Sequence, residues 1–226
     1  MNIRKKKFFK SIWNIIEKNN INEKFGINAG QTWYTDPRQF FISLARYKFV
    51  AKIISGKKNV LEIGCSDGFK SRIVKQEVKN LDLCDIDLHL LEDARNNLSK
   101  KWKTKIFFHD FAKKPTIKKY DAIYLLDVLE HISPSIEKKF IKNIVKSLDE
   151  KGILIFGLPS KEFQKYSRPA SISGHINCKT ATQLKKLMEK FFHNVIIFSM
   201  NDEVVHTGFS KMSCYFFSLC LTKKPK

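Results

Sequence analysis

The stretch VLEIGCSDGF at residues 60–69 decides the fold, because it joins an apolar strand directly to a glycine-containing turn and the start of a helix. Gly64 lets the chain turn sharply off the strand, and Gly68 leaves space for a ligand that a Cβ atom would obstruct. The helix that follows directs unpaired N–H groups and its positive dipole end toward the same place. The segment is therefore typical of a ligand-binding loop.

The loop lacks the patterns that bind phosphate groups. It contains no GxxxxGK[ST] motif, and no glycine follows Gly68 at the spacing of GxGxxG. Two acids, Glu62 and Asp67, would repel a pyrophosphate group. The loop therefore favours a cationic or zwitterionic ligand.

Strand-length apolar runs alternate with segments of helical periodicity along most of the chain. The predicted strands cover residues 59–63, 81–84, 106–108, 121–126, 152–157, 194–200 and 213–222. The predicted helices cover residues 37–55, 69–78, 88–98, 135–148 and 180–192. This alternation predicts a doubly wound α/β fold with a seven-stranded, mostly parallel sheet. The last strand is expected to be antiparallel, because no helix separates it from the strand before it.

Residues 1–36 precede this pattern and are predicted to form a basic N-terminal helix, over residues 8–16, and a lid segment. Residues 37–226 are predicted to form the main domain. Trp33 and Tyr34 stand in a polar stretch, so they either pack on the core or cover a ligand.

The composition is that of a globular protein with an unusual charge. Among 226 residues, 43% are hydrophobic and 28% are charged, which excludes wholesale disorder. The formal net charge is +20, but only six basic residues are Arg, whose planar fork suits phosphate and guanine contacts. A nucleic-acid partner is therefore possible but not favoured, and an anionic small molecule or a membrane surface fits the charge equally well.

Two further features concern the compartment. The apolar runs are too short for a membrane span, and no secretory signal follows the basic N-terminus. The five cysteines show no CxxC spacing, as expected for reduced thiols in a cytoplasmic protein.

VLEIGCSDGF resembles the glycine-rich first motif of class I S-adenosylmethionine-dependent methyltransferases, and further motifs of that family follow in order through Gly157. These motifs are LDLCDID, IFFHDF, YDAIYLLDVLEHI and LDEKGILIFGLPS. Ser66 departs from the pattern, which most often has Gly there. The resemblance implies a Rossmann-like methyltransferase fold and S-adenosylmethionine as the cofactor.

The resemblance also implies a set of cofactor-binding residues, most of them where strands end: Glu62, Gly64, Cys65, Ser66, Gly68, Asp85, Ile86, Asp110, Phe111 and Leu126, with Trp33 and Tyr34 of the lid segment. Asp85 would accept hydrogen bonds from both ribose hydroxyls, with Asp87 as a nearby competitor. Asp110 would accept from the adenine amino group, and Phe111 would lie beside the ring.

Methyl transfer from a sulfonium is a direct displacement, so the protein mainly aligns the acceptor and excludes water. A hydroxyl acceptor gains from a general base or a metal, and the candidate bases are His131, His175, His206 and Asp127. DVLEH at residues 127–131 resembles the Glu-x-x-Glu-His stretch of quinone-biosynthesis O-methyltransferases, which takes part in metal binding. LEH is also widespread in the superfamily as support for the local turn, so we expect no metal.

The predicted acceptor is a small molecule. Transfer to a base amino group in DNA would require [NDS]PP[YF] after the fourth strand, where the chain has LDVL. Residues 159–176 and 201–212 are predicted to bind the acceptor, because long polar loops of compact domains are often functional. We therefore predict methyl transfer to a hydroxyl or amine of a sugar, nucleotide-sugar or other metabolite. The alternatives are an RNA or protein methyltransferase, or a non-catalytic S-adenosylmethionine-binding protein.

Overall fold

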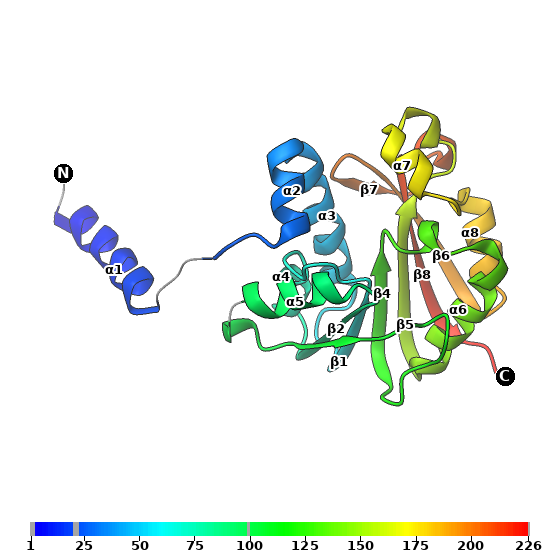
Figure 1. Cartoon of the computed structure of the whole chain (residues 1–226), viewed down its shortest axis with the longest axis horizontal. Helices are drawn as coiled ribbons and strands as arrows, with labels where there is room; N and C mark the ends of the chain where they lie inside the picture. The colour runs from blue at the N-terminus through cyan, green and yellow to red at the C-terminus, as the bar shows by residue number, and fades with distance from the viewer. Residues whose placement is uncertain (1–2, 20–22, 99, 226) are drawn as a thin grey trace.

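The computed structural model describes residues 3–19, 23–98 and 100–225, which form an eight-stranded sheet of order β3-β2-β1-β4-β5-β8-β6-β7 between helices (Figure 1). The strands are β1 (Asn59–Ile63), β2 (Asn80–Asp85), β3 (Lys105–Phe108), β4 (Tyr120–Leu126), β5 (Leu148–Pro159), β6 (Phe192–Asn201), β7 (Val204–His206) and β8 (Tyr215–Lys223). The first five strands pair in parallel, and β8 pairs antiparallel with β5 and β6. The predicted mostly parallel sheet with an antiparallel last strand is confirmed.

The sheet has one strand more than predicted, and β5 (Leu148–Pro159) is longer than the predicted strand over residues 152–157. β7 covers only Val204–His206 and pairs antiparallel with β6, within the segment 201–212 that was predicted as a loop. Three residues are too few to show the alternating pattern of a strand, because that pattern needs about four or more positions.

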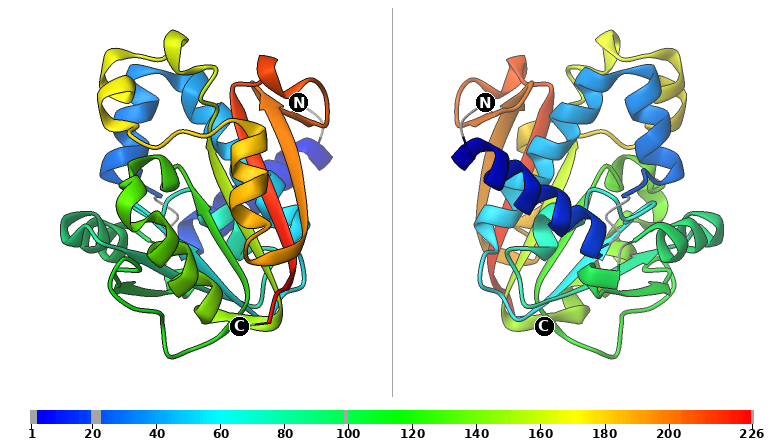
Figure 2. Two further views of the ribbon diagram at one scale, coloured as in Figure 1. Left: turned by 90° about the vertical axis from the view of Figure 1, so that its right-hand side faces the viewer. Right: turned by 90° about the vertical axis from the view of Figure 1, so that its left-hand side faces the viewer.

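Helices cover both faces of the sheet. The helices of the described residues are α1 (Ile3–Asn19), α2 (Ile27–Thr35), α3 (Pro37–Ile53), α4 (Arg72–Lys75), α5 (Leu88–Asn97), α6 (Pro134–Ser147), α7 (Pro169–Gly174) and α8 (Ala181–Met188), with short 3-10 turns η1 (Lys100–Trp102), η2 (Leu129–His131), η3 (Gln164–Tyr166) and η4 (Ser210–Met212). Of these, α1 lies apart from the sheet (Figure 1). Val50, Val74 and Leu91 bury α3, α4 and α5 against one face, whereas Ile144 and Met188 bury α6 and α8 against the other. Figure 2 shows these two helical layers from opposite sides. The doubly wound arrangement follows from these two separate cores.

The helices differ from the sequence prediction around the glycine loop. The helix predicted over 69–78 is reduced to α4, and hydrogen bonds of the tighter i to i+3 type flank it. α2 was not predicted, because Ala29 is its only buried residue and the segment shows no apolar periodicity. α3 begins as predicted at Pro37, where the Asp36 carboxylate accepts a hydrogen bond from the Gln39 N–H at 3.2 Å.

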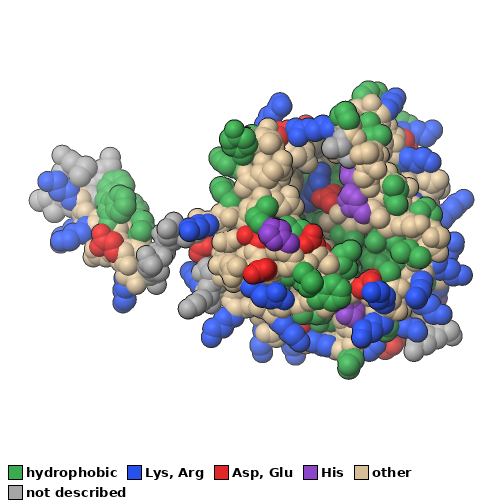
Figure 3. Space-filling model, viewed as in Figure 1, with side chains coloured by type: hydrophobic (Ala, Val, Ile, Leu, Met, Phe, Trp, Pro, Cys, Tyr) green, Lys and Arg blue, Asp and Glu red, His purple; other side chains and the backbone are tan. Residues whose placement is uncertain are grey.

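The site lies where β1 and β4 meet. From β1 the chain continues outward to β2 and β3, and β4 returns to the other side of β1, so the strand order reverses at this point. Loops leaving neighbouring strands in opposite directions open a crevice at their carboxyl ends. Figure 3 shows the surface hollowed at this edge, with acidic and basic side chains inside the hollow and His on its wall.

Two further predictions can be compared with the fold. All five cysteines are free thiols. Across the described residues, no helix combines the length and the apolar character that crossing a bilayer requires.

Candidate functional site

The glycine loop after β1 folds through three residues with positive φ: Gly64 at 74°, Ser66 at 54° and Gly68 at 68°. A Cβ atom on Gly64 would lie 2.3 Å from Cγ2 of Val128, so this position requires glycine for space as well as for conformation. Ser66 adopts the left-handed conformation without being glycine. Its N–H donates to Asp85 at 2.8 Å and its hydroxyl accepts from the Asn28 amide at 2.8 Å, which offsets the strain.

This geometry leads to a stability prediction. Gly64→Ala is expected to lower the free energy of unfolding by about 2–3 kcal/mol, measured by urea denaturation, because strain and a clash with Val128 add. Gly56→Ala is the matched control, since Gly56 also has positive φ (79°) but nothing lies within 4 Å of its Cβ position. It should cost only about 1 kcal/mol. Equal losses in the two variants would show that the contact with Val128 is irrelevant.

The two acids after β2 have different partners. Asp85 accepts backbone hydrogen bonds from Ser66, Ile86 and Asp87, so its carboxylate is held between the two loops. Asp87 caps α5 by accepting from the backbone N–H groups of the first turn. Asp87 is therefore the cap. The Asp85 carboxylate has four lone-pair sites and uses three of them for these backbone hydrogen bonds, so one site on Oδ2 remains for a ligand.

α2 lies over the glycine loop. The Ala29 N–H donates to the buried Asp67 carboxylate at 2.6 Å, and a Cβ on Gly26 would lie 2.4 Å from Cβ of Asp67. Trp33 stacks on neighbouring phenylalanine rings, whereas Tyr34 is 88% exposed. The lid segment is thus fastened to the loop, with Trp33 as part of its packing.

Several other predicted cofactor residues are buried beneath the site. Glu62 is 1% exposed, and its carboxylate oxygens accept hydrogen bonds from the hydroxyls of Tyr47 at 2.7 Å and Tyr124 at 2.6 Å. Burial raises the pKa of Glu62 to about 7. Cys65 and Leu126 are also buried. These side chains shape the loop from below.

The loop after β3 places its two predicted residues differently. The Asp110 carboxylate accepts from the Ala112 N–H at 2.8 Å and remains partly exposed. The Phe111 side chain is 1% exposed and packs in the core against the His109 ring, so it does not face the crevice. Ile86, which is 64% exposed, is the apolar side chain at the end of β2 that remains open to a ring.

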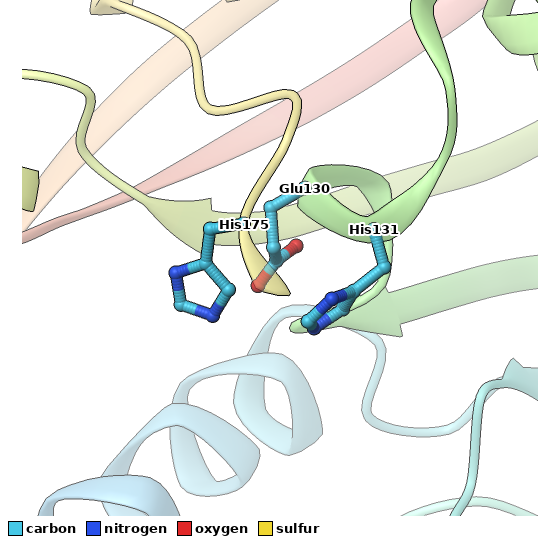
Figure 4. Close-up of side chains that lie close together, drawn as sticks. All are labelled: Glu130, His131 and His175. Atoms are coloured by element: carbon cyan, nitrogen blue, oxygen red, sulfur yellow. The ribbon is translucent and has the colours of Figure 1, made fainter. Parts of the chain in front are cut away.

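Glu130, His131 and His175 point toward one another beside the glycine loop (Figure 4). A carboxylate oxygen of Glu130 and one ring nitrogen of each histidine lie within 4.8 Å of one another. Glu130 and His131 come from η2 after β4, whereas His175 follows α7. The structure thus brings together two of the predicted bases, His131 and His175, with Glu130. The sequence analysis considered Glu130 only as part of the DVLEH resemblance.

Within the described parts of the chain, the Glu130 carboxylate is buried without the hydrogen bonds that a buried acid normally has. Its side chain is fully buried, and neither carboxylate oxygen has a hydrogen-bond partner among the described residues. Burial raises the pKa of Glu130 well above its usual value, and the nearby Asp127 raises it further. A buried carboxylate without partners is costly, so this position is suited to a ligand that supplies positive charge or a proton.

Both histidines are oriented through Nδ1. Nδ1 of His131 lies 2.9 Å from the Gly174 carbonyl, and Nδ1 of His175 lies 3.1 Å from the Gln164 amide oxygen. An Nδ1–H that donates to oxygen leaves Nε2 with its lone pair, which is the state of a metal ligand or a base. Burial lowers the pKa of His175, and the neighbouring His131 lowers it further, which favours the neutral ring.

Asp127 has a different role from the other predicted bases. Arg46 donates to both of its carboxylate oxygens, at 3.0 Å and 2.9 Å, and the guanidinium stacks 3.9 Å above the Tyr215 ring. Asp127 is therefore neutralised by an ion pair that joins α3 to the end of β4. Sequence reasoning missed Arg46, because a basic residue within a helix of apolar periodicity carries no local sign of its partner.

Lys70 is a second residue that the motifs did not indicate. It directly follows the glycine loop, and burial lowers the pKa of its ammonium group despite the nearby Asp127 carboxylate. Lys70 and Arg46 bring positive charge to the crevice. They are candidates to hold an anionic part of a ligand.

His206 lies outside the cluster. On β7, its Nε2 lies 3.0 Å from the Asn201 amide oxygen and its Nδ1 accepts from the Gly208 N–H at 2.9 Å. Both ring nitrogens are therefore engaged in stabilising the β6–β7 hairpin. Residues 159–176 do reach the site, because they carry His175.

A salt bridge joins the two segments above the crevice. Arg168, at the start of α7, forms an ion pair with Asp36, which lies between α2 and α3. The lid segment and residues 159–176 are therefore connected across the opening. A cavity of about 720 Å³ lies on the other side of His175, between α6 and α8.

The chain is similar in sequence to one protein family and in fold to solved structures. The methyltransferase domain family matches residues 37–195. The methyltransferase domain of bacterial CtHen1-C has a TM-score of 0.67 and 16% identity, covering 81% of this chain and 100% of that chain. The N-methyltransferase NodS from Bradyrhizobium japonicum, solved with S-adenosyl-L-homocysteine, has a TM-score of 0.59 and 19% identity. The match covers 84% of this chain and 87% of that chain.

A third structure covers nearly the whole chain. It is an S-adenosylmethionine-dependent methyltransferase from Clostridium acetobutylicum, with a TM-score of 0.64 and 13% identity over 99% of this chain and 100% of that one. Among curated proteins, none matches the chain. At these identities the solved structures establish the fold.

Proposed function

The chain belongs to the methyltransferase domain family, with the class I fold and S-adenosylmethionine as cofactor, and from that premise we propose that it methylates a hydroxyl group of a small molecule. The observation that carries this proposal is the buried Glu130 carboxylate, which has no hydrogen-bond partner within the described part of the chain and faces two oriented histidines. An amine acceptor needs only to be unprotonated, whereas a hydroxyl needs help to lose its proton. A cluster of this kind supplies that help.

The residues around the glycine loop fit the cofactor. Gly64 and Gly68 supply the left-handed backbone that the loop requires, and the Asp85 carboxylate keeps one lone-pair site, on Oδ2, for a ribose hydroxyl. Lys70 is the candidate to supply positive charge for the carboxylate of the methionine portion, because the Arg46 guanidinium is paired with Asp127. When bound, the cofactor supplies a methyl group that is already activated on sulfur. The chain then has to align the acceptor oxygen and keep water out.

The cluster also fits a divalent cation, contrary to the prediction from sequence that no metal takes part. One carboxylate and two imidazole nitrogens form a donor set that suits first-row transition metals. Glu130, His131 and His175 would hold the ion, which would lower the pKa of a bound hydroxyl toward neutrality. Gly174 and Gln164 fix the two imidazole rings, and Arg46 keeps Asp127 engaged outside the cluster.

The bridge between Asp36 and Arg168 supports a small acceptor. It joins the segments on both sides of the crevice, so a narrow site is favoured over an open groove. The proposal therefore specifies a hydroxylated metabolite, such as a sugar. An RNA or protein acceptor is the alternative that the experiment below distinguishes.

The test is transfer of labelled methyl groups from S-adenosylmethionine into a metabolite extract by the full chain. We expect label in the small-molecule fraction, a loss of at least about tenfold after chelation, and recovery on addition of manganese or zinc. Full activity in the chelated protein would refute the cation. Label found only in RNA or protein would refute the small acceptor, and cofactor binding without any transfer would favour a non-catalytic protein.

A further inference from the structure

α1 has a large apolar face that is exposed. Phe8 is 60% exposed, Phe9 44%, Ile12 37% and Trp13 60%. At 100° per residue these four side chains fall within an arc of about 140° on one side of the helix. Surface helices of globular proteins normally bury such a face against a core. Figure 1 shows α1 apart from the sheet and its covering helices.

The opposite side of α1 is basic. Residues 3–19 contain six Lys or Arg and a single acid, Glu17. Lys7, Lys10 and Lys18 fall on the arc that faces away from the aromatic side chains, and Lys6 lies at the border of the apolar arc, beside Trp13. The helix therefore combines an exposed apolar stripe with an excess of positive charge.

We propose that α1 binds the surface of an anionic lipid bilayer, with its axis in the membrane plane and its apolar face in the boundary between headgroups and acyl chains. This inference is independent of the methyl-transfer proposal. Phe and Trp are suited to that boundary, and lysine stems extend so that their ammonium groups reach anionic headgroups.

Charge and polarity together favour lipid over other partners. A second copy of α1 would offer an apolar face, but it would bring the same excess of positive charge. RNA would offer negative charge, but it has no apolar layer in which to bury Phe8, Ile12 and Trp13. An anionic bilayer offers both.

The experiment is co-sedimentation of the full chain with vesicles of phosphatidylglycerol and phosphatidylcholine, compared with phosphatidylcholine alone. We expect binding to the anionic vesicles to be at least about tenfold stronger and to weaken as salt is added. Phe8→Ser/Trp13→Ser should lose binding at all salt concentrations. Lys6→Gln/Lys10→Gln should bind more weakly and respond less to salt.

A matched control and a folding readout complete the design. Ile117→Ser/Ile196→Ser removes two exposed apolar side chains from the main domain and should bind vesicles like the wild type. S-adenosylmethionine affinity, measured by calorimetry, should be unchanged in all variants, which shows that the domain is folded.

Three results would overturn the proposal. The first is no binding of the wild type to anionic vesicles at low salt, and the second is unchanged binding of Phe8→Ser/Trp13→Ser. The third is a dimer or an RNA complex of the wild type that depends on Phe8 and Trp13 while vesicles remain unbound.

Discussion

Glu130→Gln is expected to lower kcat for methyl transfer by about a hundredfold or more, while the Kd for S-adenosylmethionine changes by less than about twofold. Gln keeps the shape of the side chain but removes the carboxyl group that the two histidines face. The carboxylate lies at the end of β4, away from the Asp85 position that is assigned to the ribose. Activity should therefore fall without a loss of cofactor affinity, measured by steady-state kinetics and calorimetry.

Glu77→Gln is the control for this substitution. Glu77 forms an ion pair with Lys52 away from the crevice, so its neutralisation should leave kcat unchanged. If Glu130→Gln retains wild-type kcat, the cluster takes no part in the reaction. If both kcat and cofactor affinity fall together, Glu130 supports the fold of the site and does not act on the acceptor.

Asp85→Ala is expected to weaken S-adenosylmethionine binding by about 1–3 kcal/mol, which is about 5- to 150-fold in Kd. The carboxylate organises the loop through the Ser66 N–H and is assigned to the ribose hydroxyls. Its removal leaves polar groups of both the loop and the sugar without partners. Calorimetric titration with S-adenosylmethionine measures the effect.

Asp87→Ala separates ribose recognition from general damage to the β2–α5 turn. Asp87 caps α5, so its loss should cost about 1 kcal/mol of stability and little cofactor affinity. If Asp87→Ala loses cofactor affinity and Asp85→Ala retains it, Asp87 binds the ribose and the assignment to Asp85 is wrong.

The sequence predicted the parts of the site that local pattern determines. A buried parallel strand is a continuous apolar run, and the residue that follows it lies at the carboxyl edge of the sheet. For this reason Gly64, Asp85, Asp110 and Asp127 were predicted at neighbouring strand ends, where the structure has them. The cap of α3 by Asp36 was also predictable, because a capping acid directly before Pro is a local signal.

The remaining features depend on contacts that are distant in the chain. His175 lies close to His131 although 44 positions separate them in the sequence, and Arg46 pairs with Asp127 across 81 positions. No spacing in the sequence reports such a pair. The pairing of Arg46 with Asp127 also changes the interpretation of DVLEH. The first acid is neutralised, and the second finds no hydrogen-bond partner among the residues that the structure describes.

The most direct test of the account identifies the atom that receives the methyl group. The wild-type chain is incubated with isotopically labelled S-adenosylmethionine and a metabolite extract, and the labelled product is analysed by NMR. We predict a methoxy group on a small molecule, formed by the wild type and not by Glu130→Gln. An N-methyl product, or a methoxy product formed equally well by Glu130→Gln, would contradict the account.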